Sequence, residues 1–131
     1  MIQKDKDLLL KDLCARIPYR VICNDSRHGD SRITEIDVVE KTVYCYDFDE
    51  YAELGKIKPY LRPMSNMTEE EIVELKWLNE KCDAMPTFEY VPVENYRIYD
   101  WMNRHHFDFR NLIEKGLALE APSDMYNIKE K

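Results

Sequence analysis

Hydrophobic residues near the start of the chain recur with the period of an α-helix. Leu9, Leu13 and Ile17 are spaced four residues apart, which places them on one side of a helix. The spacing predicts an amphipathic helix over residues 5–17. Pro18 is expected to end it, because a proline disfavours helical backbone at the residue before it.

Alternation of hydrophobic and polar residues then predicts a series of short β-strands. The strands are expected over residues 19–23, 33–39, 42–48 and 57–61. Pro59 would restrict the last of them to a sheet edge or to a strand end, because proline has no N–H to donate. The polar segments between the strands predict a loop at residues 24–31 and a loop or a helical turn at residues 47–53.

The second and third of these strands are expected to form an antiparallel hairpin. Only Glu40 and Lys41 separate them, and this dipeptide is not a favoured two-residue turn, so a longer turn is expected. Within the second strand, Thr34, Ile36 and Val38 are predicted to share one face. The pattern leaves open whether the strands close into a small barrel.

The clearest helix start in the chain follows the last of these strands. Thr68 and Glu71 match the N-cap and N3 positions of a capping box, in which each side chain accepts a hydrogen bond from the backbone N–H of the other. Met67 and Ile72 occupy the positions of a hydrophobic staple. The helix is predicted to run to about Lys81. Its hydrophobic residues recur at helical spacing: Ile72, Leu75, Leu78 and Cys82.

Shorter elements are predicted in the rest of the chain: a helix at about 96–105, a turn at 111–115 ended by Gly116, an extended segment at 117–121 and a frayed tail from about 122. Together the patterns predict a single α+β domain over residues 1–131. It would hold an N-terminal helix, a small antiparallel sheet of three to four strands, barrel-like if it closes, and then two to three helices. Trp77 and Trp101 are expected to be buried.

Charge is spread unevenly along the chain, whose formal net charge is −7. Residues 1–63 carry 11 basic and 12 acidic side chains, whereas residues 64–131 carry 8 and 14. An acidic half disfavours nucleic-acid binding, because that affinity rests on Lys and Arg contacting phosphates. No hydrophobic run is long enough for a secretory signal or a membrane span. We therefore expect a cytoplasmic protein without a membrane partner.

The four cysteines, Cys14, Cys23, Cys45 and Cys82, include no C-x-x-C pair. A zinc ribbon or a thioredoxin-like site is therefore not expected. Each lies beside hydrophobic residues, which predicts reduced thiols in the core.

The adjacent residues His105 and His106 are the most conspicuous polar pair. With Asp100 or Asp108 they could supply a metal site or a general base. Neighbouring side chains on a helix or strand point in different directions, so both rings rarely bind one ion. The favoured interpretation is that one ring packs at the edge of the core and the other caps the end of a helix.

One basic and aromatic cluster lies in the first half of the chain: Lys56, Lys58, Tyr60 and Arg62. Such a cluster can contact phosphates and stack on bases. Pairing with the acidic residues 47–53 is the favoured alternative. The sequence contains no glycine-rich phosphate loop, G-x-S-x-G or H-E-x-x-H motif. No catalytic, cofactor-binding or metal-binding residue is therefore assigned.

Residues 8–19, 57–71 and 100–122 resemble small uncharacterised proteins encoded by phages and mobile elements of anaerobic gut bacteria. The likeness spans most of the chain. It implies a genomic setting and no chemistry, because no activity, cofactor or catalytic residue is assigned to that group.

These observations favour a non-enzymatic protein-binding or regulatory protein of phage or mobile-element origin, with an unidentified protein partner and an oligomeric state left open. One alternative is a small hydrolase or metal-dependent enzyme that uses His105, His106 and Asp108. A second is a nucleic-acid-binding module that uses the basic and aromatic cluster at residues 56–62.

Overall fold

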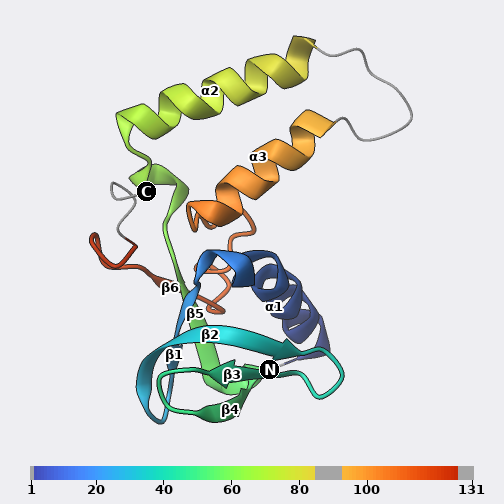
Figure 1. The fold of residues 1–131 in the computed structure, drawn as a ribbon, viewed down its shortest axis with the longest axis vertical. Coiled ribbons are helices and arrows are strands. Elements are labelled where there is room, and N and C mark those ends of the chain that lie inside the picture. The colour runs from blue at the N-terminus through green and yellow to red at the C-terminus, as the bar shows by residue number, and fades with distance from the viewer. Residues whose placement is uncertain (1, 85–92, 127–131) are drawn as a thin grey trace.

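The computed structural model of the chain is an α+β fold with an open, mixed β-sheet (Figure 1). It describes the backbone of residues 2–84 and 93–126, and the side chains of all of these except 79–84 and 93–95. The helices and strands in chain order are α1 (Gln3–Arg16), β1 (Ile22–Asp25), β2 (Gly29–Asp37), β3 (Thr42–Cys45), β4 (Glu50–Glu53), β5 (Ile57–Leu61), α2 (Glu69–Ala84), α3 (Val93–Arg104) and β6 (Leu119–Glu120). Three short 3₁₀ helices lie at Ile17–Tyr19, Leu54–Lys56 and Met64–Asn66.

The six strands follow the order β4-β3-β2-β1-β5-β6. All neighbours are antiparallel except β5 and β6, which are parallel. The outermost strands β4 and β6 each pair on one side only, so the sheet is open and does not form the barrel that the sequence had left as a possibility. The sheet also holds more strands than the three to four predicted, because β4 lies in a predicted loop and β6 was predicted only as an extended segment outside the sheet.

The predicted N-terminal helix is confirmed as α1, which packs its buried residues Leu9 and Leu13 on the sheet. Pro18 lies in the 3₁₀ helix that follows α1. Cys14 is the residue after Leu13, about 100° further around the helix, and it is exposed. The prediction of a core thiol is therefore wrong for Cys14. Cys23 and Cys45 are buried and free, as predicted.

Two predicted loops contain strands. Between β1 and β2 a tight turn, in which the Asp25 carboxylate accepts the backbone N–H of Arg27, lets the strands pair from Asp25 and Gly29 onward. The predicted loop 47–53 contains β4, whose residues pair with β3. In β5, Pro59 pairs with β1 inside the sheet, and β6 contacts only the residues after it.

The β2–β3 hairpin is confirmed, with a four-residue loop closed by the Asp37 carboxylate, which accepts two backbone N–H groups. The predicted shared face of β2 is wrong. The pairing register shifts between Ile33 and Glu35, and such a bulge reverses the alternation of faces. Ile33 is therefore buried and Ile36 packs against the same core, while Thr34 is exposed. Val38 lies beyond the end of β2, in the hairpin loop, and is 56% exposed.

A second, smaller hydrophobic cluster includes residues of α2 and α3, two helices that lie beyond the end of the sheet (Figure 1). It is centred on three buried residues, Trp101, Met102 and Phe107. The residues Leu75 and Leu78 of α2 pack against it. Trp101 is buried as predicted, but Trp77 is 54% exposed, because the side of α2 that faces the cluster is the one that carries Leu75 and Leu78.

Buried ionic contacts connect the α1 side of the molecule to the second cluster. Arg16 and Asp12 are fully buried and form an ion pair at 2.9 Å. Arg16 also donates to the carbonyl of Phe107 at 2.6 Å, and Arg110 binds the other carboxylate oxygen of Asp12 at 2.6 Å. The segment after α3 is thereby fixed against α1.

The chain after this segment makes the predicted turn, with Gly116 at φ +77°, and the predicted extended segment is β6. The Tyr126 hydroxyl then accepts the backbone N–H of Ile22 at 2.9 Å and donates to the Tyr60 carbonyl at 2.9 Å. Residues 127–131, which complete the predicted frayed tail, lie outside the described residues. No helix in the described ranges is long and apolar enough to cross a membrane.

Candidate functional site

The start of α2 is fixed by the capping box that the sequence predicted. The Glu71 carboxylate accepts the backbone N–H of Thr68 at 2.9 Å, and the Thr68 hydroxyl accepts that of Glu71 at 3.2 Å. Two backbone donors that a helix start leaves open are thus satisfied. Met67 packs on the second cluster, but Ile72 is 41% exposed. The two residues of the predicted hydrophobic staple are therefore not both buried.

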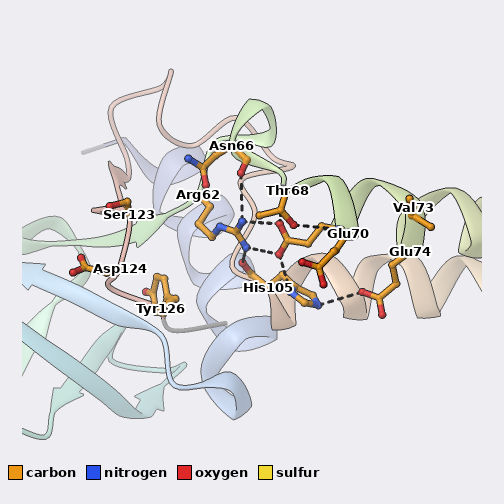
Figure 2. Close-up of a pocket in the computed structure, with 11 residues that line it drawn as sticks. Arg62, Asn66, Thr68, Glu70, Val73, Glu74, His105, Ser123, Asp124 and Tyr126 are labelled. Atoms are coloured by element: carbon orange, nitrogen blue, oxygen red, sulfur yellow. Dashed lines mark hydrogen bonds and ion pairs between the residues drawn. The ribbon is translucent and has the colours of Figure 1, made fainter. Parts of the chain in front are cut away.

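Arg62, labelled in Figure 2, binds the same carboxylate. Its two terminal nitrogens donate to the two oxygens of Glu71 at 2.8 and 2.7 Å, a bidentate pair whose side chains are 8% and 6% exposed. Further donations reach the carbonyls of His105 and Asn66 at 3.2 and 3.5 Å, and the guanidinium lies 4.2 Å from the centre of the Phe107 ring. The positive charge of Arg62 is therefore neutralised by Glu71 within the protein.

These contacts set the ionisation of Glu71. Burial alone would raise its pKa, but the hydrogen bonds from Arg62 and Thr68, together with the Arg62 charge, lower the pKa from 4.5 to about 2. Glu71 is thus a carboxylate throughout the physiological pH range.

His105 lies between two carboxylates of α2. Its Nδ1 is 3.3 Å from Glu71 and its Nε2 is 3.9 Å from Glu74. The ring centre is 4.5 Å from that of Trp101, whose indole N–H donates to Glu74 at 2.6 Å. His105 therefore packs at the edge of the core, as predicted for one of the two histidine rings.

A pocket of about 680 Å³ opens beside this network. Figure 2 shows Arg62, Asn66 and Thr68 between the start of α2 on one side and the segment that carries Tyr126 on the other. The residues that line it are Arg62, Asn66, Thr68, Glu70, Glu71, Val73, Glu74, His105, Ser123, Asp124 and Tyr126. We call it the acidic pocket.

The lining of the acidic pocket carries four carboxylates and one arginine. Because Arg62 and Glu71 neutralise each other, Glu70, Glu74 and Asp124 set its charge. All three are exposed. A group that enters the pocket therefore meets a negative field, which favours cations and repels phosphates and carboxylates.

His105, His106 and Asp108 do not converge on one site. The ring of His106 stacks on that of Tyr126, with 3.7 Å between the ring centres. The expectation that the second ring caps a helix end stays a prediction. Both oxygens of Asp108 accept backbone N–H groups, from Leu112 and Ile113.

Asp100 is likewise engaged, by the Tyr19 hydroxyl and by Arg104. Among the described residues, no group of three or more His, Cys, Asp and Glu side chains could hold a metal ion.

The predicted basic and aromatic cluster is divided by the fold. Lys56 and Lys58 are exposed, whereas Tyr60 donates to Asp30 at 2.7 Å. Arg62 is buried and pairs with Glu71, not with an acid of residues 47–53 as the favoured alternative supposed.

Known proteins offer no guide to this arrangement. Comparisons with protein families, with curated proteins and with solved structures give no match. The acidic pocket itself is therefore the main indication of function, and the resemblance to phage and mobile-element proteins stays a prediction.

The sequence analysis missed the acidic pocket. Glu70, Glu74 and Asp124 were not singled out, and Arg62 was considered as part of a different cluster. One signal was available: Glu71 uses one oxygen as a capping-box acceptor, and a carboxylate with spare acceptor capacity at a helix start is a natural partner for a nearby arginine.

Proposed function

We propose that the protein is a non-enzymatic protein-binding module that binds a positively charged segment of a partner protein in the acidic pocket. The observation that carries the proposal is the composition of the pocket. Among the described residues that line it, Arg62 is the only Lys or Arg, and it already pairs with Glu71, whereas three further carboxylates are present.

The size of the pocket supports a ligand larger than an ion. Its volume of about 680 Å³ is within the range of sites that enclose organic ligands. A lysine or arginine side chain with its neighbouring residues would fit such a space. The carboxylates of Glu70, Glu74 and Asp124 could then accept hydrogen bonds from an ammonium or guanidinium group, which are the stronger, charge-assisted kind.

The two alternatives have less support from the geometry. A nucleic acid would bring phosphates to a negative surface, at an energetic cost. A hydrolase built on His105, His106 and Asp108 would need these groups to face one substrate, but Asp108 caps a turn and the two rings stack on different partners. The cytoplasmic location and the phage or mobile-element origin are proposed from the sequence and from the resemblance alone.

Peptide selection tests the proposal. A displayed library of random dodecapeptides is selected against the wild-type protein, and bound peptides are measured by fluorescence anisotropy. We expect enrichment of Lys and Arg, with affinity that falls as salt rises. The double variant Glu70→Gln/Glu74→Gln should bind at least about tenfold more weakly, which corresponds to about 1.4 kcal/mol.

The matched control is Glu40→Gln/Glu53→Gln, which removes the same charge from exposed residues outside the pocket. It should bind as the wild type does. Selected peptides without basic residues, or equal losses in the two double variants, would overturn the proposal.

A further inference from the structure

Two large hydrophobic side chains are exposed on α2 beside the acidic pocket. Val73 is 67% exposed and Trp77 is 54% exposed. Their four-residue separation places them on one side of the helix, one turn apart. Val73 also lines the pocket, so this hydrophobic stripe, Val73 and Trp77, begins inside the pocket and continues along α2 away from it.

Charged residues flank the stripe unequally. Glu70 and Glu74 lie on the flank that lines the pocket. By helical geometry Glu69 and Lys76 lie on the other flank, where their charges offset each other. The surface thus presents an apolar strip with an acidic border on one side.

The helix α2, which carries the stripe, is fixed by contacts on its other side. Leu75 and Leu78 pack on the second hydrophobic cluster, and the buried Arg62–Glu71 pair anchors the first turn of α2. A ligand would therefore meet side chains that are presented by a fixed helix, which reduces the ordering that binding requires.

Resting on the proposed function, we infer that the partner's segment is amphipathic. Its basic side chains occupy the acidic pocket, and its apolar side chains cover Val73 and Trp77. Charge complementarity selects this occupant: the carboxylates beside the stripe attract a basic segment and repel an anionic membrane. A second copy of the chain would bring the same carboxylates to the same place. Tryptophan is also among the residues that contribute most at protein interfaces.

The test uses two synthetic peptides of identical Lys and Leu content as probes. In one, the leucines recur with helical spacing to form an amphipathic helix; in the other, the order is scrambled so that no apolar face forms. The amphipathic peptide should bind at least about tenfold more tightly. Val73→Ser and Trp77→Ser should each abolish most of this preference.

Val39→Ser is the matched control, because Val39 is 85% exposed in the β2–β3 loop, outside the pocket. Thermal melts show that each variant is folded, and Val73→Ser alone decides the question if Trp77→Ser is unfolded. Equal affinity for the two peptides, or unchanged affinity in Val73→Ser, would overturn the inference.

The outcomes also separate the inference from the proposed function. If Glu70→Gln/Glu74→Gln weakens the binding of both peptides but Val73→Ser leaves the preference for the amphipathic peptide unchanged, the acidic pocket is supported and the amphipathic partner is refuted. If neither substitution matters, both fall. Binding to phosphatidylserine vesicles, or a dimer in sedimentation that Trp77→Ser dissociates, would replace the inferred occupant by a membrane or by a second copy.

Discussion

Replacing Arg62 with methionine should destabilise the protein more than any exposed charge substitution. Methionine keeps much of the hydrophobic stem but removes the bidentate partner of Glu71, whose side chain is only 6% exposed. An uncompensated carboxylate would then be buried, and breaking a buried pair in this way costs about 3–5 kcal/mol. The carbonyls of His105 and Asn66 would lose a donor as well.

This loss is large compared with the stability of a typical domain, about 5–15 kcal/mol. With a urea dependence of about 1–3 kcal/mol per M, the midpoint of unfolding should fall by about 2 M. Unfolding followed by tryptophan fluorescence suits the measurement, because Trp101 is buried in the cluster that Arg62 adjoins.

The matched control is Arg32→Met. Arg32 also forms a short ion pair with a carboxylate, Asp47, at 2.8 Å, but the side chains are 52% and 37% exposed. Water screens such a pair, so its loss should shift the midpoint far less. Arg62→Met/Glu71→Gln should recover part of the stability, because no buried charge is left. A midpoint for Arg62→Met no lower than that for Arg32→Met would refute the reasoning.

Three other outcomes are expected. Thr68→Ala should lower the free energy of unfolding by about 1 kcal/mol, the usual loss of an N-cap, in urea titrations, while peptide binding is unchanged. The folded-state pKa of Glu71, about 2, lies below the ordinary 4.5. The contribution of Glu71 to the free energy of unfolding is therefore present above pH 4.5 and lost as the pH falls toward 2. In thermal melts at stepwise lower pH, Glu71→Gln should lose less stability over this range than the wild type. Tyr126→Phe removes the hydroxyl that bonds the backbone of Ile22, so amide exchange at Ile22 should speed up and stability should fall by about 1–3 kcal/mol. Unchanged exchange would contradict this last expectation.

The parts of the fold that the sequence predicted correctly depend on neighbouring residues. The helix α1 follows from leucines four residues apart, and the start of α2 follows from Thr68 and Glu71, which bond each other across one turn. The β2–β3 hairpin likewise joins adjacent strands. Each signal lies within a few residues, so no knowledge of distant contacts was needed.

The features that were missed depend on long-range pairing or on a local irregularity. A one-residue shift of register in β2 exchanges its faces, and the alternation of residues does not reveal where the shift occurs. The polar strand β4 is fixed by its pairing with β3 and not by its own composition. The acidic pocket is assembled from the β5–α2 connection, the first turns of α2, His105 and residues 123–126, so its walls meet only in the folded chain.

The four acids at the start of α2 illustrate how helical geometry divides roles among similar residues. Glu70 and Glu71 are adjacent, yet a step of about 100° around the helix turns one toward solvent and the other toward Arg62. Glu71 is therefore a structural residue, already neutralised, and it adds nothing to the net charge of the pocket. Glu70 and Glu74, one turn apart, share the side that lines it. Without Glu71, Arg62 would present an uncompensated positive charge to the pocket and would weaken its selectivity for basic ligands. The same ion pair that holds the start of α2 thus keeps the pocket negative.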